Sequence, residues 1–187
     1  MNYLSTKFVH LIIVFALLMC SSTLAQFTAD MLQTKDGETS TTKFYVEGLL
    51  YRMDIEEEGQ EGYVLVNQNE GITRVVMPSN KMYMEMGSRD MMSMANDVFQ
   101  SIEQQKETYE TKLLGDEIIS GYECEKYQLI FDGNVITTYW QSSQFEFPLK
   151  VISGPNSEMV MELTNINEGD IDDSMFQIPD GYTKVER

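Results

Sequence analysis

Histidine, cysteine and facing carboxylates supply much of enzyme chemistry, and this chain has few of the first two. Its one histidine is His10, and its two cysteines are Cys20 and Cys124. If the first 25 residues are removed, as argued below, no histidine remains. That loss excludes Ser-His-Asp and Cys-His catalysis, and zinc, copper or haem sites with histidine ligands. The sequence therefore predicts a protein that is not an enzyme and that has no cofactor and no metal site.

Carboxylates are the most numerous catalytic residue type in the chain. A hydrolase with two facing carboxylates needs no histidine, but among 30 acidic residues such pairs arise by chance, and none stands in a recognisable motif. Residues 168–173 offer oxygen ligands for calcium without the spacing of an EF-hand loop. A solvated turn with a helix N-cap is the simpler interpretation of that segment.

The N-terminal residues have the order of a secretory signal peptide. A short start ending at Lys7 precedes the largely apolar residues 8–19, and the small residues Thr23 and Ala25 occupy the positions that a signal peptidase reads. The apolar run is shorter than the about 20 residues of a membrane span. We therefore predict that residues 1–25 are a signal peptide and that the protein is exported.

The remaining residues 26–187 are expected to form a single domain, periplasmic or secreted, without a transmembrane helix, because no second long apolar run follows. A lipid anchor on Cys20 is the alternative location. It is disfavoured because Met19, the residue before that cysteine, is not small.

The mature chain would have 162 residues (187 minus 25), with 12 basic and 30 acidic side chains and a net charge of −18. Such a surface repels phosphate groups, so we expect no nucleic acid as a partner, and anionic membrane surfaces are disfavoured as well. Cys124 alone cannot form an internal disulfide, so the domain depends on its hydrophobic core. We expect the Cys124 thiol itself to be a small buried apolar group.

Most of the chain alternates apolar and polar residues with a period of two, which predicts β-strands. Asp36-Gly37 and Asp132-Gly133 are typical of tight hairpin turns between such strands. Residues 89–105 instead have helical spacing, with Ser88 as an N-cap. The predicted strands cover residues 27–34, 39–46, 49–56, 63–67, 72–77, 81–86, 109–114, 122–131, 135–141, 145–152 and 159–166.

These elements favour a mainly β fold with one or two helices. The short connections predict antiparallel neighbours, and about ten strands at a spacing of roughly 4.8 Å make a sheet far wider than one helix can cover. The sheet must then curl, which gives a strongly curved antiparallel sheet or unclosed β-barrel with a helix packed across its concave face. The hollow inside would hold either side chains alone or side chains and an apolar ligand.

Seven of the fourteen methionines fall between Met77 and Met94. Three interpretations remain open for them: ordinary core, a pliable lining for an acyl chain, or a copper(I) site, which the absence of repeated Met-x-x-Met pairs weakens. The candidate cavity-lining residues are Tyr51, Met53, Met82, Met84, Met86, Met91, Phe99 and Trp140. Arg52 is a candidate for holding a lid or a polar headgroup, with pairing to a cross-strand carboxylate as the simpler alternative.

Several segments resemble a bacterial envelope family known as domain of unknown function 4412. They are residues 115–127 (GDEIISGYECEKY), 138–140 (TYW), 147–150 (FPLK), 162–166 (ELTNI) and 176–182 (FQIPDGY). That family is similar to the outer-membrane lipoprotein carriers. The resemblance implies an unclosed barrel with helices on its concave side, bound acyl chains and no catalytic residues. It also implies that an arginine early in the sheet, here Arg52, helps to hold the lid.

Together these observations predict an exported, non-catalytic periplasmic protein that binds or carries a lipid or acyl-chain ligand in the hollow of a curved sheet. The alternative is an envelope protein–protein interaction module whose interior is filled by side chains and holds no ligand. The expected partner is accordingly a lipid or another envelope protein.

Overall fold

A computed structural model of the chain describes residues 26–57, 59–87, 98–154 and 158–186. These residues form a single sheet of twelve strands, two short 3₁₀ helices and one α-helix, α3 (Val98–Thr108). The strands are β1 (Gln26–Lys35), β2 (Glu38–Glu47), β3 (Leu50–Glu57), β4 (Gln60–Asn67), β5 (Ile72–Met77), β6 (Met82–Gly87), β7 (Glu110–Ile119), β8 (Tyr122–Phe131), β9 (Asn134–Ser142), β10 (Pro148–Ser153), β11 (Met159–Glu168) and β12 (Thr183–Val185).

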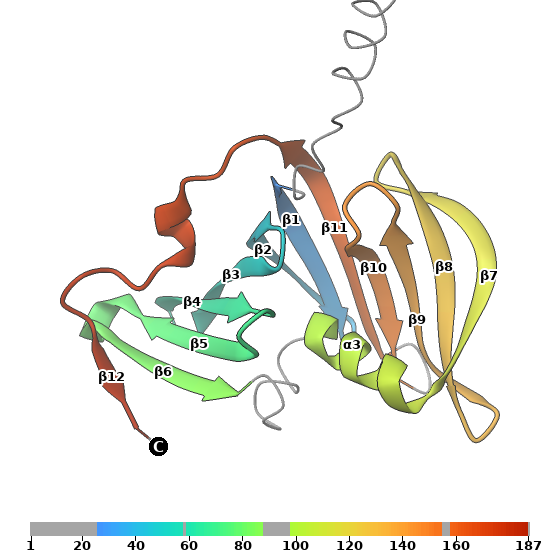
Figure 1. Cartoon of the computed structure of the whole chain (residues 1–187), viewed down its shortest axis with the longest axis horizontal. Helices are drawn as coiled ribbons and strands as arrows, with labels where there is room; N and C mark the ends of the chain where they lie inside the picture. The colour runs from blue at the N-terminus through green and yellow to red at the C-terminus, as the bar shows by residue number, and fades with distance from the viewer. Residues whose placement is uncertain (1–25, 58, 88–97, 155–157, 187) are drawn as a thin grey trace, which may run out of the picture.

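The strand order is β12-β6-β5-β4-β3-β2-β1-β11-β10-β9-β8-β7, and the two outermost strands do not pair with each other. Every pairing is antiparallel except that of β12 with β6. Figure 1 shows the two halves of the sheet turned away from each other about β1 and β11, with α3 in the angle between them. The predicted unclosed, curved sheet with a helix across its concave face is confirmed.

Tight turns join most neighbouring strands, as the Asp-Gly pairs predict. Asp36 and Gly37 both have positive φ (52° and 83°), as do Asp132 and Gly133 (49° and 78°). Two consecutive positive φ values are those of the hairpin turn whose twist matches the strands on either side.

The structure corrects three details of the predicted elements. β7 does not end before Gly115 but continues to Ile119 through a β-bulge, in which Leu113 and Gly115 pair with the consecutive residues Tyr127 and Lys126. Gly115 has a φ of +135°, which a side chain would disfavour. α3 ends at Thr108 rather than at residue 105, and residues 145–147 form a loop rather than a strand. The expected helix start at 89–97 lies outside the described residues.

We call the face of the sheet that carries α3 the inner face and the opposite one the outer face. Alternating residues of β1 and β2 point inward and are buried. The exposed fraction of the residue is 0% for Phe27 and Phe44 and 2% for Ala29. The main core lies here, between the sheet, α3 and the loop before β10.

A second, smaller core lies on the outer face. Tyr63, Leu65 and Val76 of β4 and β5 are buried there. Ile178 and Tyr182 of residues 170–186, which we call the C-terminal segment, pack on them. That segment continues into β12, which pairs with β6, and Lys184 Nζ lies 2.7 Å from Glu85 Oε1. The C-terminal segment therefore covers the outer face of β4 and β5, and its strand β12 pairs with the edge of β6.

Candidate binding site

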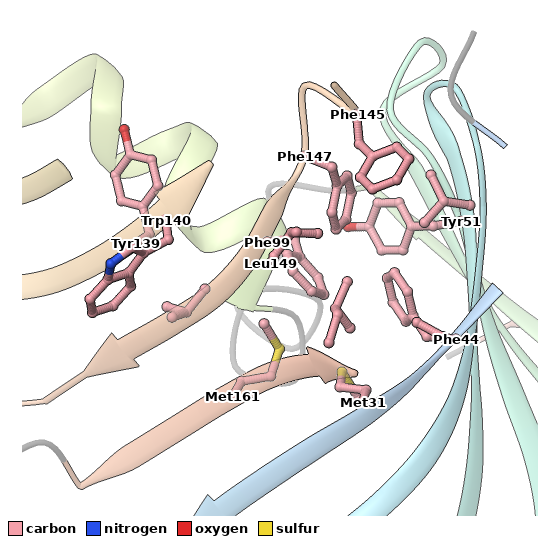
Figure 2. Packing of buried hydrophobic residues seen from close by; sticks show 14 of the residues in the cluster. Met31, Phe44, Tyr51, Phe99, Tyr139, Trp140, Phe145, Phe147, Leu149 and Met161 are labelled. Atoms are coloured by element: carbon pink, nitrogen blue, oxygen red, sulfur yellow. The ribbon is translucent and has the colours of Figure 1, made fainter. Parts of the chain in front are cut away.

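The inner face beneath α3 is filled by aromatic side chains. The ring of Phe44 lies 5.2 Å from that of Phe99 on α3, 5.7 Å from Tyr51 and 5.8 Å from Phe147, measured between centroids. Phe99 and Phe147 are 4.6 Å apart. Figure 2 shows these rings converging from β2, β3, α3 and the loop before β10. This part of the concave face is a packed core, not an empty hollow.

The inner face of β5 and β6, and of β4 beyond the buried Val66, is different, because its apolar side chains are only half-buried. A row of cross-strand neighbours runs from Met53 through Val64 and Val75 to Met84. Met82 lies opposite Met77, and Met86 opposite Thr73. All three methionines of β6 are intermediate in burial. We call Met53, Val64, Val75, Met82, Met84 and Met86 the methionine face.

Thr73 marks where α3 begins to cover the sheet. Its hydroxyl accepts a hydrogen bond of 3.0 Å from Nε2 of Gln100 in the first turn of α3, and both residues are buried. At the other end of the helix, Thr137 of β9 donates to Gln105 Oε1 at 3.0 Å. These two bonds, with Phe99 and Ile102 between them in the core, hold α3 over the aromatic cluster.

A groove with a volume of about 860 Å³ runs beside α3, along β8, β9 and the loop before β10. Four acids from these elements line it: Glu103, Glu107, Glu125 and Glu146. Lys106 is the cation among its lining residues; its Nζ lies 2.7 Å from Glu103 Oε1 and 5.0 Å from the centroid of the Tyr139 ring. Burial raises the pKa of Tyr139 well above its usual range, so the phenol stays neutral. The groove is therefore polar and acidic, unlike the methionine face.

The structure brings most of the predicted lining residues to one face of the sheet. Tyr51, Met53 and Phe99 belong to the main core, and Met82, Met84 and Met86 lie on the same face of β6 through the pairing described above. Met91 lies outside the described residues.

Trp140 is buried and counts with the main core, but its side chain lies on the outer face rather than in the hollow. Its neighbour Tyr139 faces α3, so alternation along β9 turns Trp140 to the outer face. There its Nε1 donates to Glu117 Oε2 at 2.8 Å, and the ammonium groups of Lys126 and Lys150 lie 4.8 and 5.6 Å from its ring. The hydrogen bonds from Lys126 and then from Trp140 lower the pKa of Glu117.

Arg52 also lies on the outer face, between Tyr51 and Met53, which both point inward. Its guanidinium carbon lies 3.9 Å from the centroid of the Tyr63 ring, and its Nε donates to Asp54 Oδ1 at 2.7 Å. Its partner carboxylate is thus two residues along the same strand, not across strands. A further bond of 3.4 Å goes to the backbone oxygen of Met175. In this structure Arg52 contacts the C-terminal segment, and its side chain lies on the face of the sheet opposite the methionine face.

We expect Arg52→Ala to loosen the C-terminal segment. The substitution removes a cation–aromatic contact, an ion pair and a bond to Met175, a loss of about 1–3 kcal/mol at a partly buried site. Hydrogen exchange of residues 170–186 should accelerate, and the melting temperature should fall. Lys43→Ala, which removes an exposed charge far from that segment, serves as the control; equal exchange in both variants would contradict the assignment.

Cys124 is a buried free thiol, as its position in a period-two segment predicts. Burial raises its pKa to about 11, and the thiolate is the reactive form. The folded protein should therefore fail to react with a disulfide reagent such as DTNB at pH 8, and should react fully in denaturant. Rapid labelling of the folded chain would show that the core around Cys124 opens.

Other predicted features have simple outcomes. Asp172 caps the 3₁₀ helix Asp173–Phe176, because its Oδ1 accepts a 2.9 Å bond from the Ser174 backbone nitrogen, in agreement with the turn-and-cap interpretation of this segment. No group of three or more acidic, cysteine or histidine side chains with the geometry of a metal site occurs among the described residues. No helix in the described part of the chain has the length and apolar character needed to cross a membrane.

The family model for the domain of unknown function DUF4412 matches residues 28–146 and 140–182, most of the chain. The chain belongs to the DUF4412 family. No curated protein matches it. The sequence segments that resemble this family lie on β7 to β11 and in the C-terminal segment. In Figure 1, β7 to β11 build the right half of the sheet, and the C-terminal segment runs along the left half, where it packs on β4 and β5.

Solved structures share this fold at low sequence identity. An uncharacterized conserved protein from Thermus thermophilus is 9% identical with a TM-score of 0.58, over 95% of this chain and 99% of that one. MucB is 14% identical with a TM-score of 0.53, over 86% and 59%, so this DUF4412 chain spans little more than half of MucB. A LolA superfamily protein from Nitrosomonas europaea aligns over 83% of this chain and 91% of that one at 12% identity, but its TM-score of 0.41 is too low to show a shared fold.

Proposed function

We propose that this DUF4412 protein is an exported, non-catalytic binding protein that takes a lipid or acyl chain on its methionine face. The observation that carries the proposal is the apolar row of Val64, Val75 and Met84 beside the buried Met53, because these three side chains are only half-buried although they face inward. Three methionines at alternating positions of β6 extend this row along the strand. Flexible, polarisable thioether side chains adapt to chains of varied shape.

The filled aromatic core determines where such a ligand can lie. Phe44, Phe99 and Phe147 occupy the space beneath α3, so an acyl chain would pack beside the helix, over β4 to β6, with Met53 at the boundary. Arg52 and Trp140 are not part of this proposed site, since both point to the outer face.

Export and the absence of catalysis are part of the same proposal. The signal-peptide pattern of residues 1–25 supports an envelope or extracellular location, and the absence of histidine after residue 25 supports a non-catalytic role. A MucB structure of the same fold, with a TM-score of 0.51, was solved as a complex of Pseudomonas aeruginosa MucA and MucB. That complex shows a protein of this fold class engaged with a partner.

A second candidate function, an envelope protein–protein interaction module without a ligand, is favoured by two observations. The space beneath α3 is packed, and the groove beside α3 carries four glutamates and Lys106 among its lining residues. In that case the surface alone would carry the function.

Lipid analysis separates the two candidates. Freshly exported protein would be extracted with organic solvent for mass spectrometry, and stripped protein would be melted with and without oleate. Bound lipid and a melting temperature that rises with oleate concentration are expected, because a ligand that binds only the folded state stabilises it. If the protein carries no lipid and gains no stability from oleate, the lipid proposal is wrong and the interaction module is the remaining candidate.

A further inference from the structure

β7 forms one edge of the sheet, and among the described residues it pairs only with β8. At the other end of the sheet, β6 is paired with the short strand β12. β7 has ten residues, and all but Ile119 are exposed. A long edge strand presents a row of unpaired backbone groups, and proteins usually shorten, cover or charge such edges. Figure 1 shows β7 at the outer margin of the molecule, away from the C-terminal segment that closes the other edge.

Apolar side chains gather along this edge. Ile118 is 72% exposed, Leu113 52% and Leu114 44%. At the nearby β8–β9 turn, Phe131 and Val135 are exposed as well. Five of the seven large exposed apolar residues found in the described part of the chain therefore lie on β7 or on the turn beside it, the distribution expected of a contact surface rather than of scattered surface residues.

Acidic side chains accompany them. On the inner side of the β7–β8 ladder, Asp116 lies opposite Glu125 and Ile118 opposite Glu123. None of these three carboxylates forms an ion pair with the described residues. Like charges directly opposite each other destabilise a sheet, so a positive charge from a partner would relieve the repulsion between Asp116 and Glu125.

The acidic groove begins at the same ladder. Glu125 and Tyr127 of β8 line the groove, and they are the cross-strand partners of Asp116 and Leu113. Long basic side chains of a strand placed beside β7 would extend over Asp116 towards this groove. The strand edge, its apolar residues and the groove are therefore continuous.

We infer that β7 receives an extended segment of a partner protein as an additional strand, with basic residues alternating with apolar ones. The β7 backbone would supply the hydrogen bonds, Leu113 and Ile118 the apolar contacts, and Asp116 with Glu125 the charge. A second copy of this chain is the poorer occupant, because two mature proteins of net charge −18 (12 basic and 30 acidic residues) repel each other. The inference is independent of the proposed lipid ligand, which lies on the other half of the sheet.

The test uses the mature protein and two synthetic peptides as long as β7, one alternating Lys and Val and the other alternating Glu and Val. Binding is measured by calorimetry, and the location of binding by hydrogen exchange. The Lys-Val peptide should bind and protect the amides of β7, and the Glu-Val peptide should not bind. Asp116→Lys and Ile118→Lys should each weaken binding about tenfold, since each replaces an attraction with a repulsion.

Two control variants make the same chemical changes elsewhere. Glu38→Lys on β2 and Ile55→Lys on β3 alter exposed residues far from β7 along the strand order, and they should leave peptide binding unchanged. The inference is overturned if the Lys-Val peptide does not bind, if it binds without protecting β7, if the controls weaken it equally, or if the Glu-Val peptide binds as well. Asp116→Lys should still bind oleate like the parent protein, which would show that the loss of peptide binding does not depend on the proposed lipid site.

Discussion

Replacing Phe44 with alanine should lower the free energy of unfolding by about 3–5 kcal/mol, the range for a fully buried phenylalanine. Phe44 is 0% exposed, and its ring contacts those of Tyr51, Phe99 and Phe147. Alanine would leave a void in a core where the two sides of the fold meet. Because single domains are stable by only about 5–15 kcal/mol, the loss would be a large fraction of the total.

Denaturant unfolding followed by circular dichroism measures this effect, with Phe131→Ala as the matched control. Phe131 is 52% exposed, so its truncation should change the stability by less than about 1 kcal/mol. A Phe44→Ala protein that keeps its stability would mean that the space beneath α3 already holds a loose or exchangeable filling. In that case the ligand site proposed beside α3 would have to be moved beneath it.

The architecture could be predicted from the sequence because it follows from local rules. Alternation determined which residues share a face, the Asp-Gly turns located hairpins, and the excess of apolar strand surface over helix required a curved sheet. Phe44 and Tyr51 gather beneath Phe99 for this reason. The packing of that core was not predictable, because Phe145 and Phe147 continue the alternation of β10 in sequence but lie in a loop.

The prediction of which side chain points inward failed where two adjacent residues suited the core equally well. Tyr139 and Trp140 are adjacent aromatic residues on one strand, so alternation alone cannot say which points inward. The choice depends on Lys126 and Lys150, which lie opposite Trp140 on the two flanking strands and cover its ring. Those pairings are properties of the register, which the chain acquires only when the sheet forms.

Arg52 shows a longer-range form of the same difficulty. Its position beside inward-pointing residues could be predicted from the sequence, but its contact with Met175, 123 residues away, could not. The C-terminal segment has the pattern of irregular chain, yet it crosses β3 to β6 on the outer face and ends as the parallel strand β12. Because the sheet edge at β6 is closed in this way, β7 remains the edge open to a partner.

Replacing Met84 with aspartate should lower both the stability and the affinity for oleate. Met84 lies opposite Val75 in the apolar row of the methionine face, and a carboxylate there has no cation on the same face of β5 or β6 with which to pair. We expect a loss of about 1–3 kcal/mol in stability, less than for a fully buried site because Met84 is only half-buried. Oleate should no longer stabilise the folded protein, since its acyl chain would have to displace the water around that charge.

Met84→Leu is the control for this experiment, because it keeps an apolar side chain of similar volume and should cost less than about 1.5 kcal/mol. Thermal unfolding of both variants with and without oleate separates the two effects. If Met84→Asp melts like the parent, the strand face lies in solvent. If it is destabilised but still gains stability from oleate, the acyl chain lies elsewhere. Only the joint loss, with Met84→Leu unaffected, places both an apolar contact and the ligand on the inner face of β6.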